Sequence, residues 1–214
     1  MSFRTQIIAR LQTHIANLSR FGWDDVFLLL LAFGLLVLAY GFIQLTDEVM
    51  EGETQTFDEW VLRSLRQTDD PAVPIGPPWV RELGVDTSAL GSPLILTLVV
   101  VAVVGFMLLR RHYDVMWLTI IVTTGGVALS LLLKQVIGRT RPTVVPHLEE
   151  VSTPSFPSAH AMLSAVVYLT LGILVMQVVK DRLTKVYCLF WAGLLTFIVG
   201  ASRIYLGVHY PTDV

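Results

Sequence analysis

The chain has 214 residues, of which 54% are hydrophobic and only 15% are charged. Soluble domains have about 45–50% apolar and about 25% charged residues, so this composition indicates an integral membrane protein. Fifteen basic and seventeen acidic residues give a net charge of −2, which excludes a nucleic-acid-binding protein that acts through overall basicity. The single cysteine excludes a disulfide framework and a cysteine-based metal cluster.

Five segments are long and apolar enough to cross a bilayer, which requires about 20 apolar residues in a helix. Before them, residues 1–25 place apolar side chains at helical spacing between arginines, which predicts a cytoplasmic amphipathic helix at the membrane surface. The predicted spans are residues 26–45, 93–109 (extended by 90–92), 115–133, 161–179 and 186–202. The sequence therefore predicts an all-α polytopic transmembrane helical bundle, forming a single membrane-embedded domain over residues 1–214.

The loop over residues 46–92 is long and rich in acidic residues. Thr56 and Glu59 match the pattern of a capping box, which marks the start of a helix. Apolar side chains then recur at helical spacing, at Phe57, Trp60, Val61 and Leu65. This loop is therefore expected to contain an interfacial helix.

Lysine and arginine in short loops determine the orientation of a membrane protein. Eight basic residues lie in the N-terminal segment and in the second-to-third and fourth-to-fifth connections. These parts are expected to be cytoplasmic. The loops over 46–92 and 135–160 and the C-terminus are then expected on the outer face.

Four of the remaining basic residues gather at the outer ends of the third and fifth predicted spans: Lys134, Arg139, Arg141 and Arg203. One such cation could simply extend toward lipid head groups or neutralise a helix C-terminus, but a cluster indicates a site for an anion. At the start of the fourth span, Pro157 suits the first helical position and Ser155 or Ser158 can cap it. The N–H groups of such a helix start bind phosphate readily.

Two histidines on the same face are candidate catalytic residues. His160 lies at the start of the fourth span, and His209 lies four residues before Asp213. Pro211 is expected to open a further helix with Asp213 in its first turn, where negative charge is favoured. A carboxylate there can hold one imidazole nitrogen and leave the other as a nucleophile.

Three motifs occur in order: K-x6-R-P over residues 134–142, P-S-A-H over 157–160, and S-R-x5-H-x3-D over 202–213. They resemble the motifs of the type-2 phosphatidate phosphatases, also called lipid phosphate phosphatases. The arrangement is similar to that of their bacterial membrane members of the phosphatidylglycerophosphate phosphatase B type. The catalytic motifs would then occupy residues 134–213. Because the family normally has six spans, the resemblance also implies a sixth helix after Val214.

The resemblance implies a role for each motif residue. His209 would attack phosphorus and become a phosphohistidine, Asp213 would orient it, and His160 would act as general acid and then as general base. The phosphoryl oxygens would be held by the side chains of Lys134, Arg141, Ser158 and Arg203 and by the backbone around Ala159. Ala159 stands where the family usually has glycine, and Arg139 is expected to be a neighbouring surface cation without a family role. No metal and no other cofactor is expected.

The expected function is a metal-independent phosphatase that acts on a lipid phosphate among the membrane lipids. Candidate substrates are phosphatidate, phosphatidylglycerophosphate, diacylglycerol pyrophosphate and undecaprenyl diphosphate. A phosphotransferase using the same phosphohistidine is an alternative, and a non-hydrolytic transporter of anionic lipids is a weaker one. The expected location is a bacterial cytoplasmic (inner) membrane, with the site on the outer face. No nucleic-acid partner is expected, and the sequence does not indicate an oligomeric state.

Overall fold

The computed structural model describes residues 22–214, so the amphipathic helix predicted for the N-terminal segment lies outside the described residues. The chain divides into two compact units, Met1–Glu51 and Gly52–Val214. Within residues 22–214 every regular element is a helix, and the only β-type pairing is an isolated bridge between Arg66 and Pro74. The predicted all-α class is confirmed, whereas the single domain stays a prediction.

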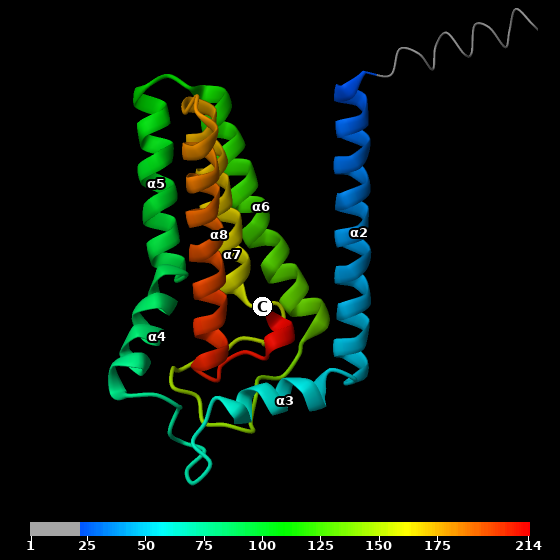
Figure 1. Ribbon diagram of the computed structural model, residues 1–214, viewed down its shortest axis with the longest axis vertical. Helices are drawn as coiled ribbons and strands as arrows, with labels where there is room; N and C mark the ends of the chain where they lie inside the picture. Colours follow the sequence, from blue (N-terminus) through cyan, green and yellow to red (C-terminus); the bar gives the residue numbers. More distant parts are fainter. Residues whose placement is uncertain (1–21) are drawn as a thin grey trace, which may run out of the picture. The chain divides into compact units, whose positions relative to one another are not determined.

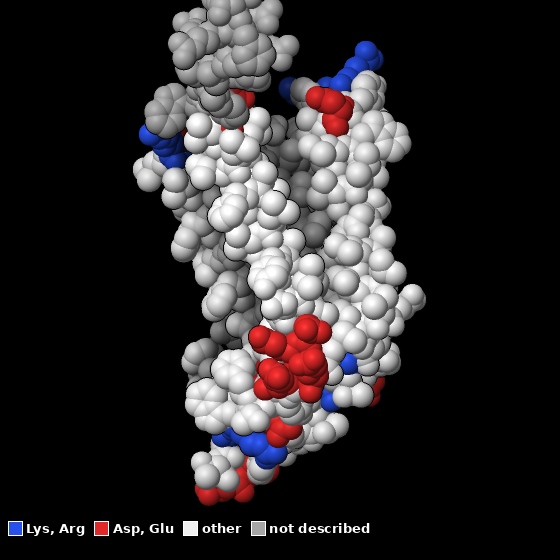
Figure 2. All heavy atoms as spheres, turned by 90° about the vertical axis from the view of Figure 1, so that its right-hand side faces the viewer, with Lys and Arg blue, Asp and Glu red and all other residues white. Residues whose placement is uncertain are grey.

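The first unit contains one long helix, α2 (Trp23–Glu51). It includes the predicted span 26–45 and continues for another turn and a half. No charged residue lies between Asp25 and Asp47, and the large apolar side chains along this stretch are exposed. Figure 2 shows extended areas of described surface that carry no charged side chain. This is the distribution that a hydrocarbon core requires.

The second unit is a helical bundle (Figure 1). Its helices are α3 (Gln55–Ser64), α4 (Pro78–Leu90), α5 (Pro93–Leu109), α6 (Tyr113–Ile137), α7 (Ala159–Val178) and α8 (Arg182–Tyr205), followed by the short 3-10 helix η1 (Pro211–Asp213). With α2, the helices α6, α7 and α8 are long and apolar enough to cross a membrane, and α4 and α5 form one further span with a 44° bend. The five predicted spans are therefore confirmed when α4 and α5 are counted together.

Small and weakly polar residues form the contacts inside the bundle. The face of α6 that packs inward carries Thr119, Thr123, Gly126 and Ser130, all buried. A Cβ atom added to Gly126 would lie 3.0 Å from Val166 of α7, so the two backbones approach closely. Close contact through small residues is the usual way in which helices pack in membranes, while large apolar side chains face the lipid.

The bend between α4 and α5 lies at Gly91, in contact with two other helices. A Cβ atom at Gly91 would come within 2.8 Å of Ser164 Oγ on α7 and still closer to Val199 on α8. Ser92 then caps α5 by accepting a hydrogen bond from Ile95 N, and Pro93 occupies the first helical position. Glycine is therefore required at this position by the lack of space.

Helix α3 starts earlier than the sequence predicted. Thr54 is its N-cap residue, without a side-chain capping bond, and Thr56 already lies inside the helix, so the predicted capping box is wrong. The buried face is formed by Asp58 and Leu62, whereas Phe57 and Trp60 are exposed to 53% and 65%. The helix itself is confirmed, and its exposed aromatic side chains suit the predicted position at the membrane interface.

Candidate active site

Four segments of the second unit meet at one end of the bundle: the end of α6, the start of α7, the end of α8 and η1 (Figure 1). Two glycines with positive φ shape this region. Gly138 (φ 62°) ends α6 and turns the chain into the loop with Arg139 and Arg141. Gly207 (φ 74°) lies just after α8 and turns the chain toward His209. The three motifs are thus brought together by the ends of helices.

His209 and Asp213 lie in contact and are buried, with exposures of 1% and 3%. His209 Nδ1 is 3.3 Å from Asp213 Oδ2. The same carboxylate oxygen accepts hydrogen bonds from Tyr210 N at 2.8 Å and from Ser155 Oγ. Pro211 opens η1 with Asp213 in its first turn, as predicted, although the helix described is a single 3-10 turn. The carboxylate therefore fixes the imidazole and leaves Nε2 directed elsewhere.

The pKa values of this pair reflect its burial. Burial lowers the pKa of His209 from 6.5 to about 4, although the hydrogen bond and charge of Asp213 oppose the shift. Burial by itself raises the pKa of Asp213, but contacts with His209, Ser155 and Arg139 together hold it below its usual value. A neutral imidazole beside an ionised carboxylate is the state that a nucleophilic histidine needs.

Arg141 lies on the opposite side of the imidazole from Asp213. Its Nη1 is 3.2 Å from His209 Nε2 and donates to Val208 O at 2.6 Å. Its Nε and Nη2 donate to Thr153 O and Thr153 Oγ1, at 2.7 and 3.2 Å. Burial, together with the positive charge of Arg203, lowers the pKa of Arg141. The guanidinium is thus held against the nitrogen that would attack a phosphate.

Lys134 and Arg203 lie at the ends of α6 and α8 and are nearly fully buried. Lys134 Nζ donates to Pro154 O, whereas Arg203 Nη1 donates to Ser88 Oγ of α4 at 2.6 Å and forms an ion pair with Glu149. Arg203 Nε has no hydrogen-bond partner within the described residues. Both cations therefore lie close to the His209–Asp213 pair with donor capacity left for an anion.

His160 and Ser158 lie at the start of α7. Ser158 is the N-cap residue, and its Oγ accepts a hydrogen bond from Ala161 N at 3.5 Å, while Ser158 N donates to Asp213 O at 2.8 Å. Capping by Ser158 is confirmed, but Pro157 lies before the cap and not at the first helical position. The N–H groups of Ala159 and His160 have no acceptor inside their own helix because they belong to its first turn. The charges of Arg203, Glu149, Arg141 and Lys134 all act on the His160 ring.

Arg139 is not the surface cation that the sequence predicted. Its side chain is only 9% exposed and forms ion pairs with Asp58 at 2.7 Å and Asp213 at 2.6 Å. It also lies over the Tyr210 ring, with its guanidinium carbon 4.2 Å from the ring centre. The prediction failed because α3 covers Arg139. The contact between Arg139 and Asp58 joins segments far apart in the chain, and no local sequence pattern indicates such a contact.

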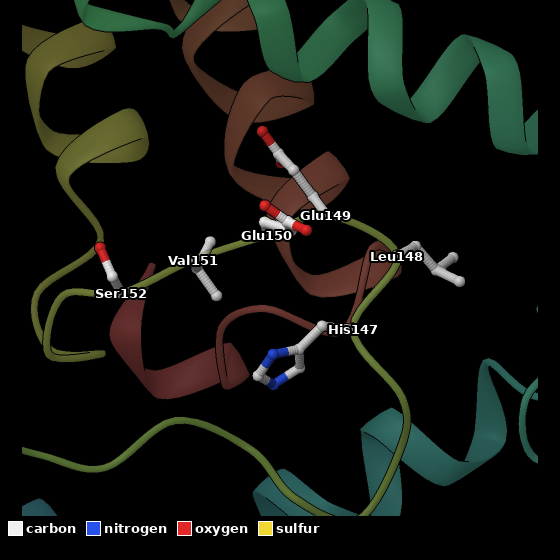
Figure 3. A pocket seen from close by; sticks show the side chains of 6 residues that line it. All are labelled: His147, Leu148, Glu149, Glu150, Val151 and Ser152. Atoms are coloured by element: carbon white, nitrogen blue, oxygen red, sulfur yellow. The ribbon is translucent and has the colours of Figure 1, made fainter.

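The loop that crosses the site carries a hollow lined by residues 147–152 (Figure 3). In this view Glu149 and Glu150 extend toward α8, whereas Leu148 points away from them. Glu149 reaches Arg203 from this loop and is half-exposed. The loop thus places Glu149 beside the cation cluster, and no role was predicted for Glu149 or Glu150 from the sequence.

Sequence analysis also missed three polar residues that support the site. Ser155 was considered only as a helix cap, but its hydroxyl donates to Asp213. Ser88 and Asp58 come from the loop over 46–92, where no motif marked them. Within residues 22–214, no group of three or more His, Cys, Asp or Glu side chains is arranged to hold a metal ion.

Sequence comparisons relate the chain to known proteins. Residues 114–214 match the sequence model of the PAP2 superfamily. The chain is 32% identical over 177 residues to phosphatidylglycerophosphatase B of Bacillus subtilis (strain 168), covering 81% of this chain and 82% of that protein.

Two solved structures are similar. The crystal structure of a transmembrane PAP2-type phosphatidylglycerolphosphate phosphatase from Bacillus subtilis matches with a TM-score of 0.74 at 28% identity, over 84% of this chain and 86% of the other. Aquifex aeolicus LpxE matches with a TM-score of 0.54 at 21% identity, over 74% of this chain and 86% of the other. The second likeness concerns the fold alone.

Proposed function

The chain belongs to the PAP2 superfamily and is an integral membrane lipid phosphatase, and we propose that it hydrolyses its substrate through a phosphohistidine at His209. The observation that carries this proposal is the buried contact between His209 and Asp213 inside a group of three cations. Phosphoryl transfer depends mainly on in-line positioning and on neutralisation of charge. The fixed imidazole of His209 and the cations around it support the proposal on both counts.

In the first step, His209 Nε2 forms a bond to phosphorus while the bond to the leaving alkoxide oxygen breaks. Asp213 holds Nδ1 and stabilises the positive charge that develops on the ring. Lys134, Arg141 and Arg203 bind the phosphoryl oxygens, together with Ser158 and the N–H groups around Ala159 at the start of α7. When the phosphate binds, the ion pair between Glu149 and Arg203 must break, or Arg203 must contact Glu149 and the phosphate at the same time.

His160 transfers the protons. As the imidazolium it donates one to the leaving alkoxide, which departs as an alcohol. As the neutral base it then removes a proton from water, whose oxygen attacks the phosphohistidine and releases inorganic phosphate and free His209. Three protein cations supply the charge neutralisation that Mg²⁺ supplies in many phosphotransferases, so we propose that turnover does not need a divalent metal.

Phosphatidylglycerophosphate is the substrate we propose, because the Bacillus subtilis relatives carry that substrate in their names and align with more than four fifths of this chain. The acyl chains would stay in the bilayer beside the exposed apolar side chains while the head group reaches the cations. From the distribution of basic residues, we propose that the site faces the outer side of a bacterial inner membrane.

The test is phosphate release by the full chain, purified in detergent, with a panel of lipid phosphates and an excess of EDTA. We expect the highest kcat/KM for phosphatidylglycerophosphate and full activity in EDTA. Loss of activity in EDTA that Mg²⁺ restores would refute the metal-independent reaction. Higher activity on a different lipid of the panel would correct the substrate.

His209→Ala should abolish turnover and leave no acid-labile phosphoenzyme in a quench experiment. His112→Ala is the matched control, because His112 is exposed at the start of α6, at the other end of that helix from Lys134. Near-normal rates in His209→Ala would remove His209 as the nucleophile.

The orientation of the protein in the membrane can be tested by labelling. Ser64→Cys in a Cys188→Ser background should react with an impermeant thiol reagent added to the periplasmic side of intact cells.

A further inference from the structure

A buried carboxylate outside the three motifs lies next to the nucleophile's turn. Asp58, on α3, is fully buried. Its Oδ1 accepts a hydrogen bond from Thr212 N at 3.1 Å, and its Oδ2 accepts one from Thr212 Oγ1 at 2.6 Å. Thr212 lies between the residues that open and close η1. Asp58 therefore binds the turn that carries Asp213 through both of its oxygens.

Arg139 joins Asp58 to Asp213. Its Nη2 donates to Asp58 Oδ2 at 2.7 Å, and its Nη1 donates to Asp213 Oδ1 at 2.6 Å and to Thr212 Oγ1 at 2.9 Å. One guanidinium thus lies between two buried carboxylates. Because Arg139 occupies Oδ1 of Asp213, the oxygen left for His209 is Oδ2.

From this geometry we propose that Asp58 is a positioning residue for the His209–Asp213 pair, acting through Arg139 and Thr212. Two buried negative charges and one positive charge form the network, and the imidazole faces its far end. A charge-assisted network of this kind fixes geometry because each member loses its partner if another moves. The inference rests on the proposed role of His209 and adds a part of the loop over 46–92 to the catalytic arrangement.

The anchoring of α3 does not depend on Asp58 alone. Leu62, on the same face, is fully buried, and Arg66 Nη1 donates to Tyr205 O at the end of α8 at 3.0 Å. Removing the charge of Asp58 therefore leaves α3 attached through these contacts. The Asp58→Asn change acts on the network, because the NH2 group of the new amide would point a hydrogen-bond donor at Arg139 or at Thr212, which are themselves donors to this side chain.

The experiment compares Asp58→Asn with Glu59→Gln in the full chain. Glu59 is the neighbouring carboxylate of α3, but it pairs with Gln55 and Arg63 and is partly exposed. We expect Asp58→Asn to lower kcat on the order of 10- to 100-fold with KM within about twofold, since small misplacements of reacting groups have effects of this size. Glu59→Gln should stay within about twofold of the wild type in both constants. Equal kcat values in the two variants would overturn the proposal.

A second measurement separates positioning from general destabilisation. If Asp58 acts through Asp213, its replacement should cost much less in an Asp213→Asn background, because coupled residues are not additive. We expect a further loss of less than about threefold there. The same fold-loss in both backgrounds would show independent action and refute the proposal.

Thr212→Val serves where Asp58→Asn does not yield folded protein. It removes the hydroxyl that bonds both Asp58 and Arg139 but keeps a side chain of similar size and the backbone N–H. Lower kcat at unchanged KM and unchanged melting temperature is the expected result, and unchanged kcat would count against the network. The phosphoenzyme assay on His209→Ala tests the underlying function separately.

Discussion

Gly207→Ala is the substitution for which the structure gives the sharpest expectation. Gly207 has φ of +74°, and a Cβ atom there would lie 2.5 Å from Arg66 Nη2, 2.9 Å from Val145 Cγ2 and 3.2 Å from Pro146 O. Arg66 is buried and its Nη1 donates to Leu65 O and Tyr205 O, which anchors the guanidinium, although Nη2 itself has no partner within the described residues. The methyl group therefore adds a steric overlap to an unfavourable backbone conformation.

The two costs can be estimated separately. A non-glycine residue in the left-handed region costs about 1–2 kcal/mol. Overpacking a dense interior costs about 1–3 kcal/mol more. The total of about 2–5 kcal/mol corresponds to a fall in melting temperature of about 4–20 °C, at about 2–4 °C per kcal/mol for a chain of this length.

Two glycines of the same chain are matched controls in a thermal-shift assay in detergent. Gly138 has φ of +62° with nothing within 4 Å of an added Cβ, so Gly138→Ala should show only the backbone cost. Gly193, inside α8, also has open space and an ordinary φ, and alanine there should be neutral or stabilising by up to about 1 kcal/mol. The melting temperature should be highest for Gly193→Ala, lower for Gly138→Ala and lowest for Gly207→Ala.

The activity of Gly207→Ala follows from the same geometry. His209 lies two residues further on, and Val208 O accepts a hydrogen bond from Arg141, so a displaced backbone misaligns His209 and Arg141 together. We expect kcat to fall at least about tenfold. A Gly207→Ala protein that melts together with Gly138→Ala and keeps full activity would refute the reasoning, because it would show that the space around Gly207 is not limiting.

Three further predictions concern the site. Arg141→Lys should lower kcat/KM about 10- to 100-fold in steady-state assays, because an ammonium group cannot keep the contacts with Thr153 and His209 at once; retention of more than half the activity would contradict this. Ser155→Ala removes one donor from the Asp213 carboxylate and should lower kcat about tenfold without changing KM, as single-turnover rates would show. Burial lowers the pKa of His209 from 6.5 to about 4, so the unfolded chain binds the proton more readily than the folded protein, and stability is lost as the pH falls from about 6.5 to about 4. The melting temperature should therefore differ more between pH 7 and pH 5 in the wild type than in His209→Gln. Equal differences in the two proteins would argue against the burial effect.

The spans could be predicted from the sequence because apolar length is a local property. Helices α2, α6, α7 and α8 contain or closely match the predicted segments, whereas the fifth span includes α4, which the sequence placed in the loop over residues 46–92. The bend at Gly91 could not be predicted, since it depends on the contact with Val199 and Ser164 in helices far along the chain. The predicted start of α3 was two residues late, because Thr54 is the N-cap residue and the capping pattern of Thr56 and Glu59 is not used.

The candidate site could be predicted where its residues lie within motifs. His160, His209 and Asp213 were found from spacing and family resemblance, and the structure brings them to the same end of the bundle as the cations. Arg139 was misjudged because its partners, Asp58 and Asp213, lie 81 and 74 residues away from it. A sequence does not show which distant carboxylate an arginine meets when no local pattern accompanies the pair.

Because of the close approach at Gly91, the two histidines of the candidate site depend on different kinds of contact. His209 depends on charges and hydrogen bonds around Asp213. The start of α7, where His160 lies, meets the backbone of Gly91, at which a Cβ atom would lie 3.3 Å from His160 O. A loss of charge near Asp213 therefore acts first on His209, whereas a gain in side-chain volume at Gly91 acts first on His160. The two effects meet at the hydrogen bond from Ser158 N to Asp213 O, which joins the start of α7 to the His209–Asp213 pair.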